Sequence, residues 1–254
     1  MSLDPPPLFA GSAQGAVRFL GRVIQSGELA ARAGKLAASL QSREEPARRV
    51  AIFIPNCPAA LVALAAGLAA GGKVLLLDPR AEAEAAIARF RPELIVTLDL
   101  AALLDRVLKT LPACPKAEVA VGRFADLLPF PRNLLLPLLR GGGLANLPPD
   151  PRFFRLSESR EGAASNSAWG SGEIFQAFSE IPLDAAELSR LSAKIPPALP
   201  GERWLLGAPL SDPAALAATY AGLGGGAEVV LSPRLDEASL DALRRRTRID
   251  RRVP

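Results

Sequence analysis

The sequence predicts an α/β protein in which parallel β-sheets are layered with helices. The main observation is that short apolar runs containing valine and isoleucine alternate with longer segments of helical periodicity. This alternation is typical of parallel strands that are covered on both faces. The composition agrees, because 49% of the residues are hydrophobic and 22% are charged. The 254 residues suffice for one large or two small domains that need no disulfide or metal for stability.

The first half of the chain supplies most of the alternation. Strands are expected at 49–54, 73–78, 93–98 and 117–122, and helices at 28–41, 57–72, 81–89 and 101–111. Asn56 follows a proline directly before a helix, so we interpret it as the cap of that helix. Asp78 is interpreted as an acid at the end of a strand, and Asp126 as a helix cap.

The second half repeats the same order of elements. Strands are expected at 203–208 and 227–232, and helices at 182–195, 213–226 and 235–246. Asp184 and Asp212 precede the first two helices and are interpreted as their caps. The βα order recurs, but no tandem sequence repeat is apparent. We divide the chain into a first α/β lobe (1–160), a loop segment (161–180) and a partial second lobe with a basic tail (181–254).

Several kinds of chemistry are disfavoured by composition. The chain has no histidine, which removes the commonest general base and every histidine-based metal site. Its two cysteines, Cys57 and Cys114, form no CxxC motif, and we interpret them as small core residues of a protein in the reducing cytoplasm. No uninterrupted apolar run of membrane-spanning length occurs, and the N-terminus does not resemble a signal peptide.

The net charge is +4, and much of the excess lies in RRRTRIDRR at 244–252. We interpret this stretch as a solvated, frayed terminus, with binding of phosphate or anionic lipid as the alternative. A second notable segment is the apolar run at 134–140 between Arg132 and Arg140. Burial against the sheet or a partner is preferred for it, and peripheral membrane contact through 129–140 is the alternative. Aromatic residues make up only 5% of the chain, and no nucleic-acid binding is expected.

The stretch RVAIFIPNCPAALVALAAGLAAGGKVLLLDPR resembles the N-terminal region of the AMP-forming acyl-CoA synthetases, which are adenylate-forming ligases. In that family a strand ends in Pro-Asn, a helix follows, and then come Ala-Gly-Gly and a strand that ends in proline. FADLLPFPRNLLLPLLRGGGLA at 124–145 is similar to a segment of bacterial long-chain fatty-acid–CoA ligases. The resemblance covers 28–156 well and 203–246 more weakly, and it implies the layered fold of the N-terminal part of a ligase, without the C-terminal lobe.

The resemblance implies a particular chemistry. Such ligases activate a carboxylate with ATP and magnesium, and then transfer the acyl group from the adenylate to coenzyme A. Their phosphate loop is rich in Ser, Thr and Gly, and its counterpart by position is SAWGSGEIFQ at 167–176. Gly170, Ser171 and Gly172 are therefore the candidate residues of a vestigial nucleotide-binding loop. No catalytic residue and no metal ligand is assigned.

This chain departs from the family pattern within that loop. Trp169 replaces a glycine, Glu173 adds a negative charge, and Ile174-Phe175 stand where the family has Pro-Lys. Losing a cation and gaining a carboxylate both disfavour a triphosphate. We therefore expect an exposed, mobile loop that does not hold ATP, and we expect no ATP, magnesium or coenzyme A as a cofactor.

A second departure is at 209–212, where Pro-Leu-Ser-Asp replaces the family's Pro-Leu-Phe-His. From these departures we predict a truncated ligase-like protein that is catalytically inactive and has an interaction or accessory role in a lipid pathway. The expected partner is a second copy, a full-length ligase or another lipid-pathway protein, bound through 203–246. The alternatives are one half of a split ligase that a second chain completes, and an incomplete gene product.

Overall fold

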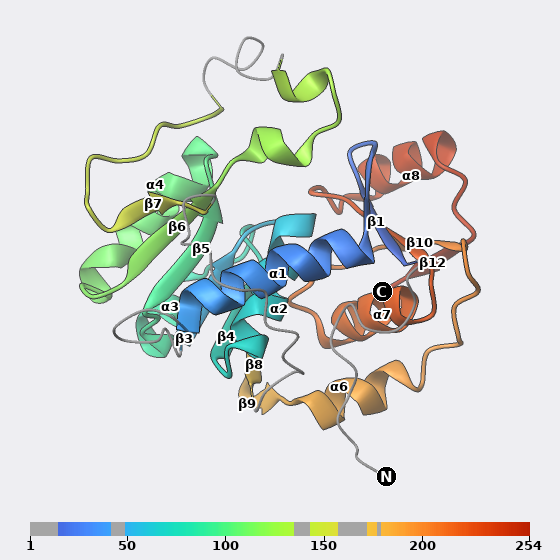
Figure 1. Ribbon diagram of the computed structural model, residues 1–254, viewed down its shortest axis with the longest axis horizontal. Helices are drawn as coiled ribbons and strands as arrows, with labels where there is room; N and C mark the ends of the chain where they lie inside the picture. Colours follow the sequence, from blue (N-terminus) through green and yellow to red (C-terminus); the bar gives the residue numbers. More distant parts are fainter. Residues whose placement is uncertain (1–14, 42–48, 135–142, 157–171, 177–178) are drawn as a thin grey trace.

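The computed structural model describes residues 15–41, 49–134, 143–156, 172–176 and 179–254. They form two β-sheets layered with helices, which confirms the predicted α/β fold with parallel sheets (Figure 1). One hydrophobic core extends through both sheets and their helices, and a small second cluster lies under the last helix.

The larger sheet has the strand order β7-β6-β5-β3-β4-β8-β9 and is parallel except for the last pair. Its strands are β3 (Arg49–Phe53), β4 (Lys73–Leu77), β5 (Leu94–Leu98), β6 (Glu118–Gly122), β7 (Phe153–Arg155), β8 (Glu173–Gln176) and β9 (Ser179–Leu183). The connecting helices are α2 (Pro58–Ala69), α3 (Glu84–Phe90) and α4 (Ala101–Thr110), with 3-10 turns η1 (Leu111–Ala113) and η2 (Phe124–Leu127). The expected strands and helices of the first half are therefore present, with ends shifted by up to three residues.

The smaller sheet has the order β12-β10-β11-β1-β2, and only the β1–β2 hairpin is antiparallel. Its strands are β1 (Ala16–Phe19), β2 (Arg22–Gln25), β10 (Arg203–Leu206), β11 (Glu228–Leu231) and β12 (Arg251–Val253). The accompanying helices are α6 (Ala185–Ser192), α7 (Pro213–Gly224) and α8 (Glu237–Arg246), whereas α1 (Ser26–Gln41) follows β2 and packs on α2 of the larger sheet. Asp184 caps α6 and Asp212 caps α7, as expected.

Strand pairing does not follow the division of the chain that the sequence predicted. β1 lies near the start of the chain but pairs with β11 in the smaller sheet, whereas β8 joins the larger sheet beside β4. An ion-pair group of three residues stabilises the pairing of β1 with β11. Glu228 accepts hydrogen bonds from Arg18 at 2.7 and 3.0 Å, and the Arg203 Nε lies 3.1 Å from the same carboxylate. The division at residues 160 and 181 stays a prediction.

No tandem repeat was expected and the similar units are not in tandem, but β3-α2-β4 and β10-α7-β11 resemble each other as two copies of one unit. Their helices begin with PAALVALAAGL (58–68) and PAALAATYAGL (213–223), which are identical at eight of eleven positions. Each helix is buried on most of its surface, as an apolar helix between layers must be. A preceding helix covers each one, since α1 packs on α2 and α6 packs on α7.

The backbone confirms that the two units are equivalent. Gly72 N donates to Gly67 O in the first unit, and Ala227 N donates to Gly222 O in the second. A residue with positive φ ends each helix, Gly71 at 72° and Gly226 at 85°, which explains glycine at both places. The copies lie far apart in the sequence, and each strand of the second copy is one residue shorter than its counterpart in the first.

The basic end of the chain is not frayed, contrary to the prediction. Arg251–Val253 forms β12, which pairs in parallel with β10. The Arg251 guanidinium lies 4.7 Å from the centre of the buried Trp204 ring and 3.2 Å from Glu202. Because these long-range contacts order the residues, local composition alone was a poor guide.

Candidate functional site

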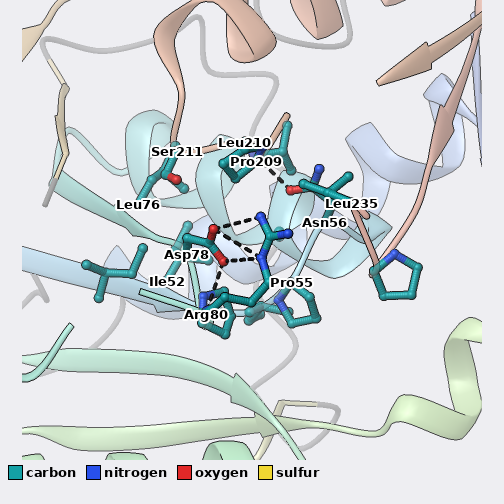
Figure 2. Close-up of a pocket in the computed structure, with 15 residues that line it drawn as sticks. Ile52, Pro55, Asn56, Leu76, Asp78, Arg80, Pro209, Leu210, Ser211 and Leu235 are labelled. Carbon is teal, nitrogen blue, oxygen red and sulfur yellow. Dashed lines mark hydrogen bonds and ion pairs between the residues drawn. The ribbon is translucent and has the colours of Figure 1, made fainter. Parts of the chain in front are cut away.

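The candidate site is a pocket between the two repeated units, at the carboxyl ends of their strands (Figure 2). Ligands of open α/β sheets bind at this edge, where loops rather than helices cover the strand ends. None of the described residues 172–176 of the predicted loop lines the pocket. Its lining residues come from both units: Ile52, Ile54, Pro55, Asn56, Ala60, Leu76, Leu77, Asp78, Pro79, Arg80, Pro209, Leu210, Ser211, Pro233 and Leu235.

Asn56 joins the two units and is not a helix cap, which corrects the prediction. Its side-chain amide donates to the Ala208 carbonyl at 2.8 Å and accepts from the Leu210 amide at 2.8 Å. Cys57 is the N-cap residue of α2 and makes no side-chain capping hydrogen bond. Asn56 is 5% exposed and its hydrogen bond from the Leu210 amide is buried, whereas the bond to the Ala208 carbonyl is partly buried.

Asp78 and Arg80 form the charged wall of the pocket. Arg80 Nη2 lies 2.8 Å from Asp78 Oδ2, and the Arg80 backbone amide donates to Asp78 Oδ1 at 2.9 Å (Figure 2). Burial opposes ionisation of Asp78, but hydrogen bonds from Arg80 outweigh it and hold the pKa of this carboxyl below its ordinary value. Asp78 lies directly after β4, as the sequence predicted.

The same Asp-Pro-Arg turn occurs a second time, at Asp150-Pro151-Arg152. There, too, the arginine donates its backbone amide and side chain to the aspartate two residues earlier. Neither Asp150 nor Arg152 lines the pocket. The recurrence indicates that Asp78 and Arg80 form a self-contained turn, so their pairing is not by itself evidence of a ligand.

Arg106 of α4 holds the loop that follows β4. Its guanidinium donates to the backbone carbonyls of Pro79 and Ala81, and it forms an ion pair with Glu84 at 2.9 Å. The hydrogen bonds from Arg106 lower the pKa of Glu84 to about 2. The guanidinium also lies 5.0 Å from the centre of the Phe53 ring. These contacts from α4 hold the loop beside the pocket in place.

The pocket has a volume of about 30 Å³, which is enough to hold water. Pockets that hold drug-sized ligands have volumes of roughly 300–1,000 Å³. In this conformation the pocket is therefore much smaller than a typical ligand site.

The predicted nucleotide residues lie elsewhere. Gly170 and Ser171 are outside the described residues, and Gly172 is buried just before β8. A Cβ atom on Gly172 would lie 3.0 Å from both Gly72 O and Leu68 Cα, so this glycine packs against the end of α2. Glu173 is in register with Lys73 at the amino ends of β8 and β4. Lys73 begins β4 and Asp78 follows its last residue, so the two lie about 16 Å apart at opposite ends of the strand.

The expectation of an exposed, mobile loop is wrong for 173–176, because these residues form β8. Ile174 is fully buried, and the Phe175 ring packs 5.6 Å from that of Phe90. Lys73 pairs with Glu173 at 3.1 Å. Pairing with β4 makes residues 173–176 part of the larger sheet. This pairing between distant segments gave no local signal.

The other predicted residues have structural roles. Asp212 accepts from the Ala214 and Ala215 amides at the start of α7, as expected of a cap. Asp126 was wrongly predicted as a cap, since its side chain makes no capping hydrogen bond and its backbone carbonyl accepts from Arg22. Cys57 and Cys114 are free and buried, and burial raises the pKa of the Cys57 thiol to about 12.

In the described part of the chain, no group of three or more acidic or sulfur side chains is arranged to hold a metal ion. No helix among the described residues is both long and apolar enough to cross a bilayer.

Comparison with known proteins supports the N-terminal resemblance. Residues 14–131 match the family of AMP-binding enzymes. The chain is 32% identical over 127 residues to a long-chain-fatty-acid–CoA ligase of Bacillus subtilis (strain 168). The aligned segment covers 48% of this chain and 22% of that protein. The resemblance predicted for the N-terminal region is therefore confirmed.

Solved structures of ligases share the fold. Apo MatB from Rhodopseudomonas palustris matches 95% of this chain and 47% of its own, with a TM-score of 0.62 and 17% identity. Coronafacic acid ligase from Pectobacterium brasiliense matches 93% of this chain and 45% of its own, with a TM-score of 0.66 and 17% identity. The chain thus spans less than half the length of these proteins, and at such identities the likeness concerns the fold alone.

Proposed function

We propose that this chain is a ligase-like accessory protein of a cytoplasmic lipid pathway that does not form acyl-adenylates by itself. In this proposal it binds no ATP, magnesium or coenzyme A. It acts by contact with a second copy, a full-length ligase or another enzyme of the pathway. The similarity of 127 residues to a long-chain-fatty-acid–CoA ligase supports the lipid-pathway assignment.

The surroundings of Gly172 carry the proposal. This residue is pressed against Leu68 and Gly72 at the C-terminal end of α2, where the helix dipole is negative. The neighbouring Glu173 adds a full negative charge, and Lys73 is already paired with it. A triphosphate at this place would be repelled by the negative end of the α2 dipole and by Glu173. Lys73 would not offset this repulsion, because it is paired with Glu173.

A second support is that the fold is kept while the position of a family site residue is used differently. The family motif at 209–212 ends in histidine, and the aspartate at this position caps α7. Relaxed selection on a useless chain would be expected to damage the core as well as the site. The closely packed repeat units around α2 and α7 favour a chain whose fold still has a use.

An activity assay tests the catalytic part of the proposal. Purified protein is incubated with Mg-ATP, a long-chain fatty acid and coenzyme A, and pyrophosphate release is measured against a full-length ligase as the positive control. We expect no release above the rate without protein. Release that depends on both ATP and the fatty acid would overturn the proposal.

Calorimetry tests the nucleotide part separately. Titration with Mg-ATP is expected to show no heat of binding for the natural protein. The double variant Glu173→Gly with Phe175→Lys removes the negative charge, frees Lys73 and adds a cation, so any residual affinity should rise in it. Micromolar binding by the unmodified chain that is lost in Gly172→Val would contradict the proposal.

The split-ligase alternative predicts a different result in the activity assay. Pyrophosphate release would appear only after addition of a second chain that carries the remaining part of a ligase. A stable complex with a full-length ligase that leaves the activity of this chain at zero would instead support the accessory role. Light scattering on the purified chain measures self-association independently of both.

A further inference from the structure

A proline-rich connection joins α6 to β10 along the outer side of the molecule (Figure 1). From Lys194 to Pro200 its sequence is KIPPALP. Prolines are common in loops, so their presence alone indicates little. The order of the residues is more informative, because Lys194, Pro197 and Pro200 follow one another at intervals of three.

The prolines restrict the backbone of this segment to extended conformations. A proline ring fixes its own φ at about −65°, and the residue before a proline is confined to the β or polyproline II region. Pro196, Pro197 and Pro200 are restricted in the first way. Ile195 and Leu199 are restricted in the second way, and residues 196–199 belong to no helix or strand. The segment therefore favours polyproline II, with roughly three residues per turn and a rise of about 3.1 Å per residue.

Side-chain exposure follows the same period of three. Ala198 is 9% exposed and belongs to the core, and Ile195, three residues earlier, is partly buried against it. One edge of the polyproline II segment therefore faces the body of the molecule. The other two edges are exposed, and they consist of Pro196 with Leu199, which is 67% exposed, and of Lys194 with Pro197 and Pro200.

Contacts with the body of the molecule hold the segment in this shape. Arg251 of β12 donates to the Pro196 carbonyl at 3.0 Å, and Glu202 accepts from the Leu199 amide at 3.1 Å. Arg251 and Glu202 also pair with each other at 3.2 Å. The two exposed edges are thus ordered before any partner binds, which lowers the entropic cost of binding.

The shape and charge of the segment identify the kind of partner. Aromatic-lined grooves, such as those of SH3 domains, bind PxxP segments in the polyproline II conformation. Lys194 is exposed, forms no ion pair with a described residue, and lies about 9 Å before Pro197 along such a segment. An acid at one end of the groove would complement it. In the described part of a second copy, Phe130 is the one large aromatic side chain among the exposed hydrophobic residues, so that part offers no such groove.

We propose that the segment from Lys194 to Pro200 is a docking site for a partner protein that carries an SH3-type groove. Pro197 and Leu199, one from each exposed edge, contact the aromatic side chains of the groove, and Lys194 pairs with its acid. The inference goes beyond the proposed function and stands without it, because residues 194–200 neither line the pocket nor belong to the loop at 167–176.

Titration of the full chain into an isotope-labelled SH3 domain tests the proposal by nuclear magnetic resonance. The probe is a purified SH3 domain that selects PxxP ligands with a basic residue three positions before the first proline. We expect chemical-shift changes at the aromatic residues of its groove, and displacement of the chain by an excess of a PxxP peptide. The double variant Pro197→Ala with Leu199→Ala should weaken binding about tenfold or more. Lys194→Glu should weaken binding too, and more strongly at low salt.

Leu134→Ala and Lys35→Glu are the matched controls, because Leu134 is 62% exposed and Lys35 is an exposed lysine of α1. Both should bind like the natural protein. All changed side chains are on the surface, so the circular dichroism and the thermal midpoint should change little. The proposal would be overturned by a natural protein that leaves the groove unshifted, or by controls that lose as much affinity as the variants. Self-association that the double variant abolishes would also overturn it, since the occupant would then be a second copy.

Discussion

Replacing Asn56 tests whether one buried amide ties the two repeated units together. In Asn56→Ala the Ala208 carbonyl and the Leu210 amide both lose their partner. A buried backbone group left unpaired costs about 1–3 kcal/mol. The adjoining pocket has room for about one water, which would satisfy one of the two groups in part. We therefore expect the free energy of unfolding to fall by about 2–4 kcal/mol.

The variant Asn56→Asp keeps the acceptor for the Leu210 amide, and whether it also keeps a donor for the Ala208 carbonyl depends on pH. At about pH 7 the carboxylate accepts from the Leu210 amide but faces the Ala208 carbonyl without a proton to donate, so the loss should exceed that of the alanine variant. The folded state then favours the protonated acid, which raises its pKa above the ordinary value. The penalty is fully present above this raised pKa and shrinks as pH falls toward the ordinary value of an aspartate.

The assay is urea denaturation of the natural protein and both variants at about pH 7 and about pH 4.5, with each variant compared to the natural protein at the same pH. The corresponding fall in thermal midpoint is roughly 4–16 °C for a chain of this size. Ser211→Ala is the local control, because Ser211 lines the same pocket. A loss below about 0.5 kcal/mol in Asn56→Ala, or an aspartate penalty that is the same at both pH values, would refute the reasoning.

Three further predictions concern stability and are measured by the same denaturation assay. Gly67→Ala should destabilise by about 1–3 kcal/mol because its Cβ would lie 2.7 Å from Val74 Cγ2, and Val74→Ala should relieve part of the loss, whereas Gly224→Ala, with open space, should be neutral or stabilising. Glu84→Gln should cost about 1 kcal/mol at neutral pH, a modest value because the side chain is 42% exposed and the ion pair is screened. That cost should vanish as pH falls from about 4.5 to about 2, since the depressed pKa contributes stability only above this range. Glu228→Gln should cost about 1–3 kcal/mol and unpair β1 from β11 first, which hydrogen exchange on β1 would reveal; equal protection in variant and natural protein would contradict it.

The predicted interface at 203–246 stays untested, but the surface offers it little support. The large exposed hydrophobic residues in the described part of the chain are Val23, Leu108, Phe130, Leu134 and Leu199, and none lies within that range. The apolar residues of β10, α7 and β11 face the core instead. The run at 134–140 was predicted to be buried, yet Leu134 is exposed, and 135–140 lie outside the described residues.

The amino-acid sequence by itself determined the alternation of strands and helices, because the signals for it are local. Apolar periodicity located the principal helices, and Asp184 and Asp212 identified their own helix starts, since a cap bonds to amides two or three residues away. The N-terminal resemblance was likewise carried by one continuous stretch of chain.

Only the tertiary structure decided how distant segments pair. β1, β8 and β12 are short and contain charged residues, so nothing local distinguishes them from loops, and they are strands because a neighbouring strand offers hydrogen bonds. Asn56 has the appearance of a cap in the sequence. Its partners at Ala208 and Leu210 lie 152 and 154 residues further along the chain, a distance over which sequence pattern carries no information about contact.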